Sequence, residues 1–206
     1  MARSNRLTSA LLLFVVPALL PAQAAAPATF LDVGGFVGVQ FRNDDGAQVN
    51  GTRLAVNLTL ARPVERPFAF GGGEVTLGYA QMKVRGPISP VQENSLELAV
   101  IADAVVARAG IWRLDAGVGP VLSSSLGCTT DGAGTQPAGS VTCPHSYADH
   151  GNTMVGYRVR ANSGWRNGRA TFLLGVDLTG HTIASGPNVA SAVSVGLRYQ
   201  LRTLGR

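Results

Sequence analysis

The sequence predicts an all-β chain that forms a closed antiparallel transmembrane β-barrel of about eight strands. Apolar residues alternate with small or polar ones in segment after segment, which is the signature of half-buried strands. Only 14% of the 206 residues are charged, well below the roughly 25% of a typical soluble domain. The alternating segments number about eight, and an even number of antiparallel strands can close without leaving a hydrogen-bonding edge in lipid.

Residues 1–26 have the pattern of a secretory signal peptide. Arg3 and Arg6 precede an apolar stretch at 7–20, and small residues before Pro27 suit a cleavage site. We therefore divide the chain into a signal peptide at 1–26 and a barrel domain at 27–206. Removal of the two arginines leaves fifteen basic residues of the 17 against 12 acidic ones, a formal charge of about +3. These charges are scattered, which argues against nucleic acid as a partner.

The first four alternating segments lie in the first half of the barrel domain. They cover residues 31–41, 53–60, 74–79 and 95–106. The second is typical, since leucine or valine at the even positions alternates with Arg53, Ala55, Asn57 and Thr59 at the odd ones. We expect each segment to belong to a strand long enough to span the membrane, which takes about 9–11 residues.

The remaining four segments cover residues 112–122, 155–160, 171–181 and 192–201. The last is the clearest, with Val193, Val195, Leu197, Tyr199 and Leu201 on one face. Four connections are expected outside the cell, at 43–46, 86–90, 123–150 and 185–188. Periplasmic turns are expected at 62–73, 109–110 and 162–168, and the Gly71-Gly72-Gly73 run is predicted to be part of such a turn.

The polar faces of the segments carry charges of both signs in nearly equal number. A membrane barrel turns its apolar face to lipid, so these side chains would fill the lumen as ion pairs, because an isolated charge there is costly. The predicted interior network comprises Asp32, Arg53, Glu74, Glu97, Asp103, Arg113, Asp115, Arg158, Arg160, Asp177 and Arg198. An ion path is the alternative interpretation, but an eight-stranded interior is only wide enough for side chains to fill, which favours a polar plug.

Two cysteines, Cys128 and Cys143, flank a segment rich in glycine, threonine and serine. In an oxidising compartment they are expected to form a disulfide with each other. His145 and His150 lie nearby and open the alternative of a metal site, but two cysteines and two histidines at this spacing match no zinc pattern well. We predict no metal and no cofactor.

The final segment ends in Val195-Gly196-Leu197-Arg198-Tyr199-Gln200-Leu201. It resembles the C-terminal signal strand of bacterial outer-membrane proteins, with Gly196, Tyr199 and Leu201 at the signal positions and leucine where phenylalanine is usual. With the signal peptide and the strand count, the mature chain resembles the small OmpA-like or opacity-type outer-membrane barrels. The resemblance implies residence in the bacterial outer membrane, contact with its lipid, and the barrel-insertion machinery as a partner during assembly.

An enzymatic role has little support in the sequence. Small outer-membrane barrels include lipid A-modifying enzymes, which need a nucleophile beside a base. His181 lacks a serine two residues on, His145-Ser146 lacks an orienting group, and Asp149-His150 lies in a predicted loop. We therefore predict a non-enzymatic barrel with a structural or surface-interaction role through its extracellular loops. The alternatives are a periplasmic lipocalin-like carrier of an apolar ligand and an interfacial lipid A-modifying enzyme, and the sequence names no extracellular partner.

Overall fold

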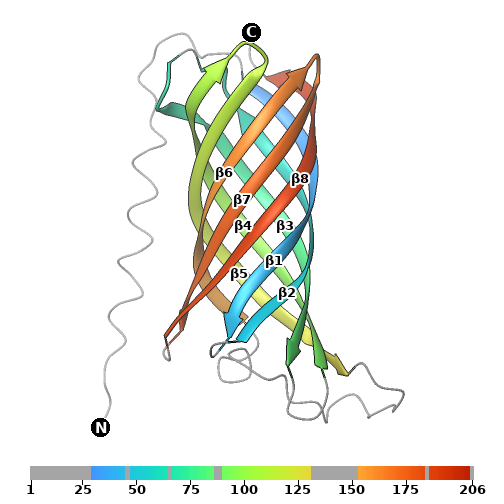
Figure 1. The fold of residues 1–206 in the computed structure, drawn as a ribbon. Coiled ribbons are helices and arrows are strands. Elements are labelled where there is room, and N and C mark those ends of the chain that lie inside the picture. Colours follow the sequence, from blue (N-terminus) through green and yellow to red (C-terminus); the bar gives the residue numbers. More distant parts are fainter. Residues whose placement is uncertain are drawn as a thin grey trace.

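The computed structural model describes residues 29–44, 47–64, 66–85, 90–130, 153–183 and 186–204. These residues form one closed barrel of antiparallel strands in sequence order, in which the last strand pairs with the first (Figure 1). The strands are β1 (Thr29–Asp44), β2 (Ala47–Ala61), β3 (Ala69–Arg85), β4 (Pro90–Ala109), β5 (Trp112–Thr130), β6 (Thr153–Asn167), β7 (Ala170–Ile183) and β8 (Gly186–Leu204). The predicted fold class is confirmed.

Alternation of side chains between the two surfaces of the wall follows the period of 2 read from the sequence. In β2, Leu54, Val56 and Leu58 are about half exposed on the outer surface. Their neighbours Asn57 and Thr59 are only 3% and 2% exposed because they point into the barrel. The outer surface is thus apolar and the inner surface polar along this strand.

A few apolar side chains also lie inside the barrel. Ala99, Ile101 and Val121 form a small buried cluster on the inner surface of β4 and β5. Leu173 on β7 and Val105 on β4 are buried as well, each 2% exposed. They fill the space that the charged side chains leave between them, so the interior is packed as well as polar.

Several predicted connections are wrong in extent, because the strands run further than the sequence pattern shows. The Gly71-Gly72-Gly73 run is not a turn but part of β3, where the pairing with β4 shifts register between Phe70 and Gly72. Gly72 has a φ of 144° and lies so close to β2 that a Cβ would be 2.0 Å from the carbonyl oxygen of Leu60. Glycine is needed at this bulge. Because glycine has no side chain, the alternating pattern of the sequence does not show that these residues belong to a strand.

Other strand ends differ from prediction for a related reason. β5 continues to Thr130, so residues 123–130 are strand rather than loop, and β6 continues to Asn167. Serine and glycine at these ends weaken the apolar signal, although the backbone ladder continues. At the end of the barrel where β6 finishes, the tight turns before β5 and after β6 centre on Gly110 and Gly168, which have φ values of 57° and 59°.

The two ends of the barrel differ in their connections. The chain enters β1 and leaves β8 at the same end, where the turns before β3, β5 and β7 also lie (Figure 1). The expected orientation places this end in the periplasm, and we call it the periplasmic end. The other four connections, which include residues 131–152, join strands at the opposite end, and their residues lie outside the described ranges.

Candidate functional site

Arg160 is the centre of the first group of charged side chains inside the barrel. Its guanidinium donates to both carboxylate oxygens of Asp103, at 3.3 and 2.7 Å, and to Oε1 of Glu74. Arg198 donates to the other oxygen of Glu74 at 2.8 Å. Thr59 and Thr76 also donate to Glu74, so this buried carboxylate is held by partners on four different strands.

A second group lies further from the periplasmic end. Arg53 contacts Glu97 at 3.1 Å and Asp177 at 2.6 Å. Arg158 contacts the same oxygen of Glu97 at 2.6 Å, and its Nε donates to Thr179 at 2.9 Å. The group therefore joins β2, β4, β6 and β7 across the lumen.

A third contact involves two residues that the sequence prediction did not include. Arg42 and Glu93 are 7% and 2% exposed and form an ion pair of 2.9 Å between β1 and β4. Arg42 is in phase with Asp32 and Gln40, and Glu93 is in phase with Glu97. Extending the alternation by one or two steps beyond each predicted segment would have found both.

Three predicted interior residues lie near the periplasmic end. Arg113 donates from Nε to Asp115 at 2.5 Å, which joins two neighbours on one face of β5. Asp32 stands apart from both groups, and its buried Oδ1 has no hydrogen-bond partner among the described residues. Eight of the eleven predicted residues are therefore brought together in the two central groups, two form a separate pair, and Asp32 forms no ion pair within the described part of the chain.

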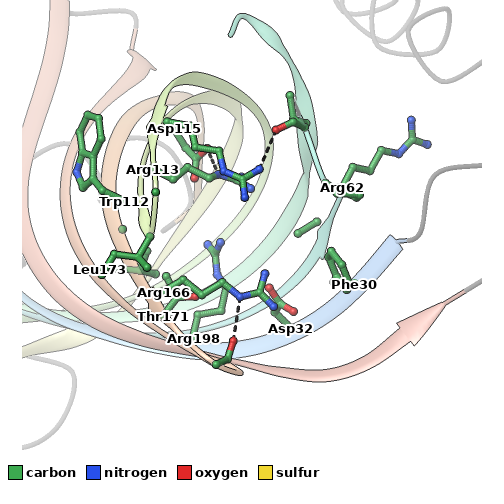
Figure 2. Close-up of a pocket in the computed structure, with 18 residues that line it drawn as sticks. Phe30, Asp32, Arg62, Trp112, Arg113, Asp115, Arg166, Thr171, Leu173 and Arg198 are labelled. Atoms are coloured by element: carbon green, nitrogen blue, oxygen red, sulfur yellow. Dashed lines mark hydrogen bonds and ion pairs between the residues drawn. The ribbon is translucent and has the colours of Figure 1, made fainter. Parts of the chain in front are cut away.

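Little empty space remains in the middle of the barrel. A cavity bordered by Arg53, Glu74, Arg158 and Arg160 measures only about 20 Å³. A single water needs roughly 10–15 Å³ by the same kind of measure. A larger cavity of about 450 Å³ opens at the periplasmic end and is lined by Asp32, Arg113, Arg166 and Arg198, among others (Figure 2).

Aromatic side chains gather on the outer surface near the periplasmic end. Trp112 donates from its indole nitrogen to Ser163 at 2.7 Å, and the rings of Trp165 and Phe172 are 6.0 Å apart. Tyr199 on β8 is 45% exposed nearby. Amphipathic rings at one level of a barrel are typical of a membrane interface.

The predicted insertion-signal residues all lie in β8, which closes the barrel against β1. Tyr199 and Leu201 are about half exposed on the outer surface. Gly196 lies under Phe36, so that a Cβ at this position would be 2.4 Å from the ring.

Some predictions fall on residues that the structure does not describe. The signal peptide at 1–26, Cys143, His145 and His150 lie outside the described residues. Cys128 pairs with Glu93 through the backbone, and His181 pairs with Asn188, but their side chains are not described. The predicted disulfide therefore stays a prediction.

The closed eight-stranded wall, its apolar outer surface and its charged interior define a class of protein, the small outer-membrane β-barrel. Neisserial surface protein A has this fold with a TM-score of 0.55 and 12% identity, over 85% of this chain and 100% of that one. Ail, the attachment invasion locus protein of Yersinia pestis, gives a TM-score of 0.51 and 8% identity over 85% and 100% of the two chains. The outer membrane enzyme PagL gives 0.49 and 16% over 82% and 99%. At these identities the likeness is one of fold.

No family model matches the chain, and no curated protein matches it either. Within the described ranges, no group of three or more histidine, cysteine, aspartate or glutamate side chains is placed to hold a metal ion. The same residues include no helix that is long and apolar enough to cross a membrane.

Proposed function

We propose that this chain is a non-enzymatic, integral outer-membrane protein that is plugged by its own side chains and contacts its surroundings through its extracellular loops. The observation that carries the proposal is the pair of charged groups across the lumen, which leaves a cavity of about 20 Å³ between them. A lumen filled in this way offers no channel for a solute. We therefore expect the protein to act through its loops and its lipid-facing surface.

The lumen also bears on the carrier alternative. A carrier of an apolar ligand needs an apolar interior, whereas Arg53, Glu74, Glu97 and Arg158 occupy the middle of this one and are at most 7% exposed. Leu54, Val56 and Leu58 face outward instead. This distribution favours a lipid-embedded barrel over a soluble calyx.

Conductance of planar bilayers tests the plug. We expect the purified barrel to give no stable conductance steps. The double variant Glu97→Ala with Arg158→Ala removes two paired side chains from the middle of the lumen without leaving either partner's charge alone, and should admit water and ions. Steady conductance of the unchanged protein would overturn the plug, and a variant as silent as the parent would show that this group does not close the lumen.

The loop between β5 and β6 is the proposed main contact with the outside. Ail, which shares the fold, has been crystallised in complex with the heparin analogue sucrose octasulfate. This complex supports a surface-interaction role for the loops, which should be tested first.

The partners during and after assembly are the insertion machinery and lipid. We propose that the insertion machinery recognises Gly196, Tyr199 and Leu201, and that the outer surface contacts lipid.

Proteinase K treatment of intact cells tests the exposure of this loop and the disulfide together. Cleavage between Cys128 and Cys143 should give two fragments that separate on a gel only after reduction. An uncut chain, on cells where an epitope inserted near residue 135 is also inaccessible to antibody, would contradict the proposed orientation. Fragments that separate without reductant would contradict the disulfide alone.

A further inference from the structure

The cavity at the periplasmic end is more than the open mouth of the barrel. It measures about 450 Å³, within the usual range for small-molecule sites, and lies among the ends of β1, β5, β6, β7 and β8 (Figure 2). The role proposed above, which concerns the opposite end and the lipid surface, makes no use of it.

Five arginines line the cavity, and three of them turn toward one point. Arg113, Arg166 and Arg198 are the cationic neighbours of Asp32, and Figure 2 shows these side chains converging in the cavity. Arg62 instead lies over the ring of Phe70, 5.6 Å from its centre, on the outer side of the wall.

The fourth inward arginine, Arg108, reaches across the rim of the cavity. Its guanidinium donates to the backbone oxygen of Val64 at 3.2 Å, a neutral partner, and it forms no ion pair with another described residue. Among the described residues, the carboxylates that line the same space are those of Asp32 and Asp115. The described lining therefore carries more positive than negative charge.

The convergent arginines keep donors available. Arg198 uses Nη2 for Glu74, while its Nε is buried and has no hydrogen-bond partner among the described residues. Arg113 uses Nε for Asp115. Arg166 is exposed and uses Nε for the backbone oxygen of Gly168 and Nη2 for the side-chain oxygen of Gln200. Arg113 and Arg198 each use one donor on a carboxylate, and Asp32 forms no ion pair within the described residues. N–H groups of all three guanidinium groups therefore remain for an anion with several oxygens.

The cavity is closed on its inner side and has an apolar wall. Arg198 lines its inner side and is paired there with Glu74, which also binds Arg160, and the next cavity along the barrel holds only about 20 Å³. Leu173 and Val64, which are both buried, provide apolar surface beside the charged side chains. A ligand would thus enter from one end, with its charge against the arginines and its uncharged part against this wall.

We propose that this cavity binds a phosphate group, presented either by the headgroup of a phospholipid or by a small soluble phosphate ester. Guanidinium groups bind phosphate through paired charge-assisted hydrogen bonds, and several of them around one point match its tetrahedral oxygens better than those of a planar carboxylate. The carboxylate of Asp32 lines the same cavity and would repel such a ligand, which lowers its affinity.

Phosphorus NMR titration of the full barrel, refolded in a sugar-based detergent that contains no phosphate, tests the proposal. Glycerol 3-phosphate and short-chain phosphatidylglycerol are the two probes, and they distinguish a soluble ester from a lipid headgroup. Arg166→Gln should weaken binding about tenfold, as expected for the loss of one charge-assisted hydrogen bond. Asp32→Asn should strengthen binding, because it removes the nearby negative charge and leaves the side-chain shape unchanged.

Arg169→Gln is the matched control, because Arg169 is exposed in the adjacent turn and does not line the cavity. It should bind as the parent does. Heat-dependent gel mobility of each variant shows that the barrel has folded. Binding of either probe with this pattern supports the site and identifies its source of phosphate. Failure of both probes to bind at about 10 mM, or binding that is insensitive to Arg166→Gln and Asp32→Asn, would overturn the proposal.

Discussion

At the residue scale, the interior is organised around two arginines that each bind two acidic partners. Arg160 bridges Glu74 and Asp103, and Arg53 bridges Glu97 and Asp177. Burial of these charges is costly, and only close pairing with further hydrogen bonds offsets that cost. The network therefore specifies which strands face each other across the lumen more than it adds to net stability.

Replacement of Arg160 by methionine should destabilise the barrel by about 3–5 kcal/mol, because Glu74 keeps Arg198 but Asp103 loses its guanidinium partner in a buried site. Urea-induced unfolding in lipid vesicles measures this change. Arg169→Met, in an exposed turn, should change the free energy of unfolding by less than about 0.5 kcal/mol. An Arg160→Met variant that is as stable as this control would show that the central group is not needed to hold the fold.

At the element scale, neighbouring strands fit each other on the outer surface as well as inside. Tyr157 on β6 pairs with Gly180 on β7, and the phenol ring covers the glycine. A Cβ at Gly180 would lie 2.8 Å from Cζ of the ring, too close for the tyrosine to stay in place. An aromatic ring over a glycine on the next strand is a known way to fix the register of a sheet.

Gly180→Ala is therefore expected to destabilise the barrel by about 1–3 kcal/mol, the usual cost of overpacking. The same substitution should cost much less in a Tyr157→Ala background, where the ring is absent. Gly73→Ala is the control, because the nearest atom to its Cβ would be 3.8 Å away. Equal costs of Gly180→Ala in the two backgrounds, measured by urea unfolding, would rule out coupling between ring and glycine.

Sequence reasoning predicts most of the strands because burial on one face repeats every second residue. It places Arg53, Glu97 and Arg158 on the polar face correctly in phase, since the structure turns all three inward. It does not predict which charges meet, because Arg53 and Asp177 are 124 positions apart and only closure of the barrel brings them together. It also ends strands early. Glycine hides the strand at Gly71–Gly73, and Asn43 and Asn94 stand where the apolar alternation would continue, which is why Arg42 and Glu93 are missed.

At the scale of the whole molecule, the outer surface of the wall is an apolar band suited to lipid. An apolar outer band runs around the wall, with aromatic side chains such as Trp165 and Phe172 near the periplasmic end. Closure of β1 on β8 leaves every strand with a partner on both sides. A protein of this form satisfies its backbone hydrogen bonds internally and exposes apolar side chains outward, as lipid requires and water disfavours.

Separation of a producing bacterium's inner-membrane, outer-membrane and soluble fractions tests this account most directly, with each fraction run on SDS gels both unheated and boiled. We expect the protein in the outer-membrane fraction, with a band that changes mobility on boiling because the closed barrel resists SDS until heated. Recovery in the soluble periplasmic fraction, with the same mobility before and after boiling, would contradict the assignment of the apolar surface to lipid.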